Sequence, residues 1–160
     1  MPRPNRPRSA CPISLALEIF GDAWSLLVVR DLMFKGRKTF RELLDAGEGI
    51  ATNVLAERLA RLEAHGILER TPDPSDGRRQ LYRLTSTGMD LGPVLVEMVL
   101  WSAAHLDTDA PPRTVEAMRS DRRAFLEQVR AEWRAIASPV RQAAPRRAAA
   151  RPGSSRARRR

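Results

Sequence analysis

The 160-residue chain has few cysteines and histidines and no long apolar run, and each shortage excludes a class of protein. A single cysteine, Cys11, cannot form an intrachain disulfide or a cysteine-based zinc site, which agrees with a reducing compartment. The two histidines, His65 and His105, are far apart and have no partners at metal-ligand spacing, so we predict surface or helix-terminal roles and no metal. No apolar stretch approaches the ~18 residues that a membrane span needs.

Enzyme motifs are also missing. The chain has no Ser/His/Asp order with supporting glycines, no glycine-rich phosphate loop and no paired metal ligands. Asp73 and Asp76 lie in a turn-forming segment and are interpreted as turn residues, not as an acid–base pair. The sequence therefore predicts no enzyme and no cofactor. The basic, Pro-rich start is not followed by the apolar core of a signal peptide, so we expect a cytoplasmic protein.

The net charge of +9 is concentrated at the two ends of the chain. Residues 1–9 carry three arginines and residues 138–160 carry eight, without any acidic residue, which leaves −2 for residues 10–137. Nucleic-acid binding must therefore depend on local clusters in the middle, while the ends add attraction for phosphate that is independent of sequence. We predict a flexible basic arm over residues 1–10 and a disordered tail over residues 138–160.

Apolar periodicity predicts two helices in the first part of the chain. The first covers residues 12–20, with Pro12 suited to the first helical position and Gly21 ending it. The second covers residues 24–34 and is apolar almost all round, so we expect it at the centre of the fold.

Residues 39–65 have the pattern of two helices joined by a tight turn. Thr39 and Glu42 form a capping-box pair that starts a short helix. A glycine-containing connection over residues 47–50 leads to a longer helix over residues 52–65. This arrangement predicts a helix-turn-helix.

The apolar period then changes from about 3.6 to about 2, which predicts strands over residues 67–71 and 80–84. The turn-forming segment between them, residues 72–79, ends in Arg78 and Arg79. A hairpin directly after the second helix of a helix-turn-helix is a wing. The predicted fold class is mainly α with a small β-hairpin: a winged helix-turn-helix over residues 11–107, dimerising through its terminal helices.

Two further helices are predicted after the wing. One covers residues 86–106, with a kink at Gly92-Pro93 because proline removes a backbone donor. Its stretch 94–101 has a single charge and is apolar on all sides, so we expect burial against the same helix of a second subunit, in a homodimer. The other, residues 113–137, lies in an additional C-terminal unit, residues 108–137.

The helix over residues 52–65, called the reading helix below, determines the predicted function. Three leucines at helical spacing fix its inward face, and the opposite face carries Asn53, Glu57, Ala60 and Ala64, with Arg61 beside them. The alanines keep this face flat for DNA, Asn53 is suited to reading adenine, and Glu57 can accept from cytosine N4. An ordinary ion pair with Arg61 explains Glu57 equally well. Thr52, at the helix start, suits a phosphate.

Basic residues flank the reading helix on both sides. Lys38 and Arg41 precede it, with Arg37 in the turn before them, and Arg78 and Arg79 follow in the hairpin. Most charge clusters are only solvated surface, but this placement favours DNA contact. Arg58 has two interpretations, an internal ion pair or a DNA contact. The predicted DNA contacts are Lys38, Arg41, Thr52, Asn53, Glu57, Arg61, Arg78 and Arg79.

A series of short motifs runs from residue 11 to residue 106. They are Cys11-Pro12, Gly21-Asp22-Ala23-Trp24, residues 26–32, residues 39–43, Gly49-Ile50, Val54-Leu55, Arg58-Leu59, Leu62-Glu63, Gly66, residues 82–85, Gly88, Leu91, Pro93 and Trp101. In combination they resemble the HxlR-type transcriptional regulators, and the hairpin turn resembles the wings of the related MarR type. The resemblance implies dimeric winged-helix repressors or activators with the first and fifth helices at the dimer interface.

Two features depart from the family pattern. Ala51 stands where the family usually has a capping serine, so the reading helix is expected to begin at Thr52. The sixth helix and the basic tail lie beyond the usual family length, so no role carries over to them.

Cys11 has two interpretations. The resemblance implies a redox sensor of oxidants or electrophiles, as the matching cysteine is in some members, and a helix N-terminus near three arginines favours the thiolate. Without a second cysteine, a disulfide needs another subunit or a small thiol. A packed, unreactive cysteine is the simpler interpretation.

These observations predict a sequence-specific regulator of transcription that binds double-stranded DNA as a homodimer. It would read an inverted-repeat operator with residues 52–65, contact flanking DNA with residues 72–79, and respond to a small-molecule or oxidant effector. The alternative is a winged-helix module that binds protein partners without specific DNA binding. A flat Asn/Ala face without exposed aromatic residues favours DNA.

Overall fold

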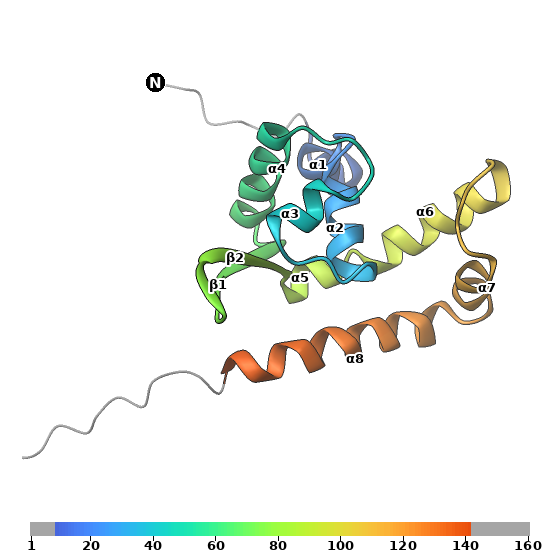
Figure 1. Ribbon diagram of the computed structural model, residues 1–160. Coiled ribbons are helices and arrows are strands. Elements are labelled where there is room, and N and C mark those ends of the chain that lie inside the picture. The colour runs from blue at the N-terminus through green and yellow to red at the C-terminus, as the bar shows by residue number, and fades with distance from the viewer. Residues whose placement is uncertain (1–8, 142–160) are drawn as a thin grey trace, which may run out of the picture.

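The computed structural model describes residues 9–141, which form eight helices and one antiparallel hairpin (Figure 1). Most of the predicted basic arm and most of the predicted tail lie outside these residues. Among residues 9–141, no single helix is long and apolar enough to cross a membrane. The first two helices meet that criterion only as a pair, and they are bent by 81°.

The two N-terminal helices are close to the prediction. α1 (Pro12–Phe20) starts at Pro12, and the N–H of Gly21 donates to the Leu17 carbonyl at 2.8 Å where the helix ends. α2 (Ser25–Phe34) begins one residue later than predicted. The cause is Asp22, whose carboxylate accepts hydrogen bonds from the N–H groups of Trp24 (2.8 Å) and Ser25 (2.9 Å).

The predicted helix-turn-helix is confirmed as α3 (Phe40–Leu44) and α4 (Thr52–Ala64). Both halves of the capping box form: Thr39 accepts from the N–H of Glu42, and the Glu42 carboxylate accepts from the N–H of Thr39 at 2.8 Å. The connection contains Gly47 and Gly49 at φ 92° and 75°, a left-handed conformation that glycine adopts without strain.

The wing consists of β1 (Leu68–Asp73) and β2 (Asp76–Leu84), paired from Leu68↔Leu84 to Asp73↔Asp76. It is longer than predicted because the turn is confined to Pro74-Ser75. There Asp73 accepts hydrogen bonds from the N–H and the hydroxyl of Ser75 at 2.8 and 2.7 Å. Residues 72–79, predicted as a loop, are therefore mostly strand.

The C-terminal helices correct the prediction in three places. The kinked helix is two helices, α5 (Ser86–Met89) and α6 (Gly92–His105). The single helix over residues 113–137 is also two, α7 (Pro112–Ser120) and α8 (Arg122–Arg141). Extended backbone at Asp121 separates them, and its carboxylate accepts from the N–H of Ala124 at 2.9 Å. Because α8 continues to Arg141, the first residues of the predicted tail are helical.

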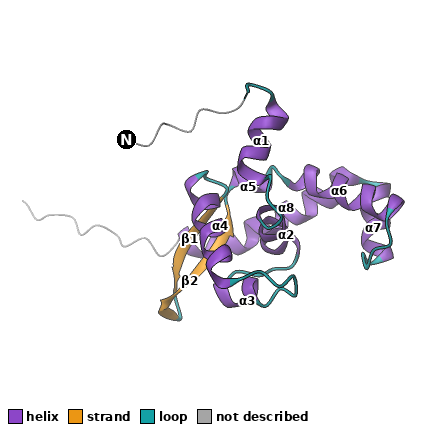
Figure 2. Cartoon of the chain, turned by 90° about the horizontal axis from the view of Figure 1, so that it is seen from above, coloured by secondary structure: helices purple, strands orange, loops and turns teal. Residues whose placement is uncertain are grey.

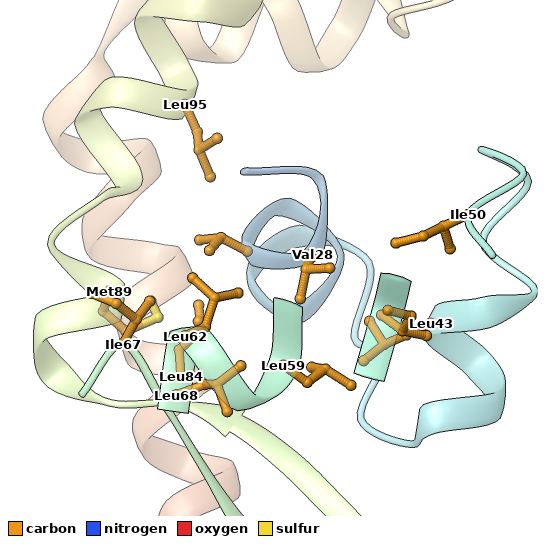
Figure 3. Close-up of a cluster of buried hydrophobic side chains, with 12 residues drawn as sticks. Val28, Leu43, Ile50, Leu59, Leu62, Ile67, Leu68, Leu84, Met89 and Leu95 are labelled. Carbon is orange, nitrogen blue, oxygen red and sulfur yellow. The ribbon is translucent and has the colours of Figure 1, made fainter. Parts of the chain in front are cut away.

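Buried apolar side chains form two clusters. The larger one joins α2, α3, α4, the base of the wing and the start of α6 (Figure 3), through Val28, Val29, Leu43, Ile50, Leu55, Leu59, Leu62, Ile67, Leu68, Leu84, Met89 and Leu95. The smaller one contains Val96 and Leu100 of α6 with Val115 and Met118 of α7, and Phe125 and Leu126 of α8 pack against it.

The smaller cluster changes the interpretation of α6. Val96 is only 1% exposed because α7 and α8 of the same chain cover it. The expectation that a second subunit must cover all of residues 94–101 is therefore wrong for one face of the helix. The opposite face, with Val94, Met98 and Trp101, stays exposed.

Candidate nucleic-acid interface

The exposed face of α4 has the predicted composition. Three leucines, Leu55, Leu59 and Leu62, are buried in the larger cluster. The residues left exposed are Thr52, Asn53, Ala56, Glu57, Ala60 and Ala64. Ala56, which the sequence analysis did not single out, completes a stripe of three small side chains next to Asn53. This surface has little relief, so a DNA groove can approach the helix backbone closely.

The N-terminus of α4 is open. The helix begins at Thr52, as predicted, and its N-cap Ala51 offers no side chain to accept from the first N–H groups. Free backbone donors and the positive end of the helix dipole together favour a phosphate at this position.

Arg61 does not lie where the sequence analysis placed it. Its Nη2 donates to the backbone carbonyl of Glu18, near the end of α1, so the guanidinium is directed towards α1 instead of the exposed face. The ion pair between Glu57 and Arg61 that the sequence left open does not form either. The Glu57 carboxylate instead lies 3.5 Å from Arg58.

Arg58 forms the internal ion pair that was one of its two interpretations. Its Nη1 lies 3.6 Å from Asp22, and the side chain is largely buried. Burial acts to raise the pKa of Asp22, but hydrogen bonds from Ser25 and from the N–H of Trp24, together with the Arg58 charge, hold that pKa below its usual value. Asp22 therefore stays ionised and fixes α4 to the turn between α1 and α2.

The basic residues before and within α3 differ in how many contacts hold their side chains. Arg37 donates to the Glu42 carbonyl at 2.5 Å, and Arg41 pairs with Asp45 at 2.6 Å while remaining largely exposed. Lys38 is exposed and has no ion-pair partner among residues 9–141. Exposed pairs such as Arg41–Asp45 are weak, so both Lys38 and Arg41 can turn to a phosphate.

The wing carries the second cationic cluster. The side chain of Arg78 is 95% exposed and that of Arg79 is 67% exposed. Their only ion-pair partner within residues 9–141 is Asp76, at 3.5 and 3.4 Å. The hairpin holds both guanidinium groups in water, near the turn.

The two cationic clusters, before α3 and on the wing, are linked by a backbone contact that the sequence analysis missed. The N–H of Tyr82 on β2 donates to the Lys38 carbonyl at 2.7 Å, and Thr39 forms an isolated bridge with Leu81. The segment just before α3 is thus bridged to the wing strand β2, and Figure 2 shows α3, α4 and the hairpin grouped on one side of the molecule. No local pattern around Lys38 predicts a partner so distant in sequence.

Cys11 is free and exposed in the single chain. It is the N-cap residue of α1. Hydrogen bonds from the backbone N–H groups of Ser14 and Ile13 lower the pKa of its thiol, which favours the thiolate. The three arginines predicted to lie nearby are outside the described residues.

Apolar side chains are exposed on α1 and α6. They are Ile13, Leu15 and Leu17 on α1 and Val94, Met98 and Trp101 on α6. On α6 they border a shallow hollow that Pro93, Glu97 and Ser102 complete. Exposed apolar side chains in such numbers on a helix are typical of a protein–protein interface.

Comparisons with known proteins agree with this fold. Among curated sequences, the chain is 42% identical over 88 residues to the uncharacterized HTH-type transcriptional regulator sll1512 of Synechocystis, a match covering 55% of this chain and 64% of that protein. The chain therefore spans just under two thirds of that relative's length. It is 36% identical over 93 residues to the HTH-type transcriptional regulator YodB of Bacillus subtilis, covering 58% of this chain and 82% of YodB.

Solved structures give the same result. The reduced form of YodB superposes with a TM-score of 0.51 at 33% identity, covering 61% of this chain and 95% of that one. The oxidised form of the redox regulator HypR superposes with a TM-score of 0.53 at 29% identity, covering 61% and 100%. A family model described as HxlR-like helix-turn-helix matches residues 19–110, which leaves α7 and α8 outside the match. The chain belongs to the HxlR-like helix-turn-helix family.

Proposed function

We propose that this chain regulates transcription by binding double-stranded DNA as a homodimer, with α4 in the major groove and the wing on flanking DNA. The observation that carries the proposal is the exposed Asn/Ala face of α4, with an uncapped N-terminus and exposed cations on both sides. The relatives named as transcriptional regulators support the same function.

The residues divide into two roles. Asn53, in the first turn of α4, is the proposed base-reading residue, because its amide can pair with the N6 and N7 edge of adenine. Glu57 remains mostly exposed beside Arg58 and can accept from cytosine. Lys38, Arg41 and Thr52 would bind phosphate and set the register, as would the wing arginines, Arg78 and Arg79. Arg61, which hydrogen-bonds Glu18, is not among the proposed contacts.

The dimer would be formed by the exposed apolar faces of α1 and α6. A two-fold dimer presents two copies of α4 to successive major grooves, so the operator would be an inverted repeat with half-site centres ~10 bp apart or a multiple of that. A winged-helix module that binds only proteins is less well supported, because no aromatic side chain lies on the exposed face of α4.

An oxidant is the proposed effector, and Cys11 the proposed sensor. The thiol is exposed at the start of α1, its pKa is lowered, and one structural relative is described as a redox regulator. Because the chain has one cysteine, oxidation to a disulfide must join Cys11 to a second subunit or to a small thiol, with two electrons passing to the oxidant.

The test begins with selection of bound sequences from random DNA, which yields the operator. Asn53→Ala should then cost about 1–3 kcal/mol of binding free energy on that operator and relax preference at one position per half-site. Thr108→Ala, exposed in the loop after α6, is the control and should change neither. Equal weakening of every sequence by Asn53→Ala would show that this residue does not read a base.

A further inference from the structure

Helix α8 lies outside the family match, yet it contacts the base of the wing. The indole Nε1–H of Trp133 donates to the carbonyl of Leu84, the last residue of β2, at 2.9 Å. The guanidinium carbon of Arg83 lies 4.5 Å from the centroid of the Trp133 ring, and its Nη2 donates to the Trp133 carbonyl at 3.4 Å. Two consecutive residues of β2 therefore hold one tryptophan of α8, by its ring and by its backbone.

Arg83 connects Trp133 to the other strand of the wing as well. It lies directly opposite Glu69 of β1, and its Nη1 is 3.8 Å from the Glu69 carboxylate. The guanidinium of Arg83 thus joins β1, β2 and α8. A change in the direction of the wing relative to α8 would break these contacts together with the bond from Trp133 to Leu84.

The rest of α8 is fixed to the start of α6. Arg130 donates to the carboxylate of Asp90 at 2.5 Å and to the carbonyl of Met89 at 3.3 Å, in the break between α5 and α6. At Gly92 the two helices approach so closely that an added Cβ would lie 2.8 Å from a methyl carbon of Leu126. The direction of α8 is therefore set before the helix reaches the wing (Figure 1).

The wing needs such support because little of it is buried. Of the residues in its two strands, only Leu68 and Leu84 at the base are buried, and a two-stranded hairpin alone is marginally stable in water. The segment before α3 supports β2 at Tyr82, and α4 supports β1 through an ion pair to Arg70 at 3.2 Å. The contacts with α8 are a third support, at the base of β2.

A small rotation at the base is amplified at the cationic end of the wing. Arg79 precedes Arg83 by four residues along β2, which is about 13 Å of extended strand. A rotation of about 15° at Arg83 would therefore move the backbone of Arg79 by about 3 Å, which is the length of a hydrogen bond. Contacts at the base thus determine which phosphates the wing arginines can reach.

We propose that Trp133 is a positioning residue for DNA binding, which acts through Arg83 and Leu84 to fix the direction of the wing. Arg78 and Arg79 then meet the DNA backbone while α4 lies in the major groove. The proposal rests on the proposed function, because the direction of the wing matters only if the wing contacts DNA. It gives α8, which lies beyond the family match, a part in DNA binding without a DNA contact of its own.

The first experiment measures amide hydrogen exchange in the full-length protein without DNA. Trp133→Ala should reduce the protection of the wing, residues 68–84, and leave that of α4 unchanged, because only the support at the base of β2 is lost. Trp133→Phe keeps a ring beneath Arg83 but loses the indole donor, so its protection should be intermediate. Ile136→Ala, at an exposed position of α8, is the matched control and should exchange like the wild type.

The second experiment is a mutant cycle on the selected operator, in which Trp133→Ala is combined with the double substitution Arg78→Ala and Arg79→Ala. Alone, Trp133→Ala should weaken operator binding and make the slope of log affinity against log salt shallower, towards that of the double variant. It should also remove hydroxyl-radical protection under the wing and keep the protection under α4. Added to the double variant, it should change affinity by less than about twofold, because no wing contact remains to be misplaced.

Three results would overturn the positioning role. They are faster exchange throughout the chain, unchanged operator affinity in a folded Trp133→Ala variant, and an equal loss of affinity with and without the wing arginines. If circular dichroism shows that Trp133→Ala does not fold, Trp133→Phe provides the same readouts. Failure of the proposed function gives a different result, since the wild-type protein would then select no operator, while exchange in the free protein would still decide whether Trp133 holds the wing.

Discussion

The guanidinium of Arg58 on α4 lies 3.6 Å from the carboxylate of Asp22, which caps the central helix α2. The same carboxylate accepts from the hydroxyl of Ser25 at 2.5 Å, so one acidic side chain serves two helices. With the bond from Arg61 to Glu18, this pair fixes the inner side of α4 to α1 and to the turn after it. Both arginines of α4 thus make contacts within the protein.

Asp22→Asn should destabilise the fold at neutral pH by about 1–3 kcal/mol, because the acceptor loses its charge and the oxygen that accepts from Ser25 and faces Arg58 is replaced by an amide donor. The folded-state pKa of Asp22 lies below its unfolded value, so its contribution is present above about pH 4 and is lost as the pH falls through the folded-state pKa. Urea unfolding at pH 7 and near pH 3 should therefore show a difference between wild type and variant that shrinks in acid. Asp45→Asn, which removes only an exposed ion pair, should change stability by a few tenths of a kcal/mol at most.

Arg78→Ala and Arg79→Ala should each weaken binding to all DNA sequences by a similar factor. Both side chains are exposed and unconstrained apart from Asp76, as expected for phosphate contacts. Each substitution should reduce the slope of log affinity against log salt by roughly one unit. Arg113→Ala, at an exposed position of α7, is the matched control. A change in the preferred operator sequence would instead assign base reading to the wing.

Arg61→Ala should leave that salt slope unchanged, because its guanidinium is bonded to the Glu18 carbonyl. The expected effect is a loss of about 1–2 kcal/mol in stability, from a broken charged hydrogen bond. Titrations of operator binding at several salt concentrations measure this slope. A slope as shallow as that of the Arg79→Ala variant would return Arg61 to the DNA contacts.

Met98→Glu should give a folded monomer, whereas Val96→Glu should not fold. Met98 lies on the exposed face of α6, so a charge there costs stability only where a second subunit covers it. Val96 is buried by α7 and α8 of its own chain, and an unpaired charge at that position is among the most destabilising of substitutions. Light scattering with circular dichroism separates the two. A dimeric Met98→Glu variant would exclude this face of α6 as the interface.

Local signals made much of this structure predictable. The capping box at Thr39, the glycines after each helix and the change of apolar period locate α1 to α4 and the wing. The break at Asp121 was missed because Met118 and Phe125, seven residues apart, keep the same apolar stripe on both sides of it. In the sequence, only Asp121, whose carboxylate can cap a new helix, indicates the break between α7 and α8.

The candidate site was predictable to the extent that it depends on one helix. Three leucines define the inner side of α4, and the exposed face follows from them. The direction of Arg61 could not be predicted, because its partner is a backbone carbonyl on another helix. The same holds for Lys38, because its carbonyl accepts from Tyr82, on a strand that lies far away in the sequence. Side chains at an edge of a helix take their direction from tertiary neighbours.

Both backbone polar groups of Lys38 are hydrogen-bonded: its N–H donates to Glu42 at 2.9 Å and its carbonyl accepts from Tyr82 at 2.7 Å. Opening the chain there would break the cap of α3 or its bridge to the wing, so the backbone segments that carry the two cationic clusters are held together. In the proposed complex, DNA would then have to adjust its own shape to meet both clusters. Duplexes whose grooves narrow or bend easily between the two contact points would be preferred even where no side chain touches a base, so the stiffness of the operator would become part of what the protein reads.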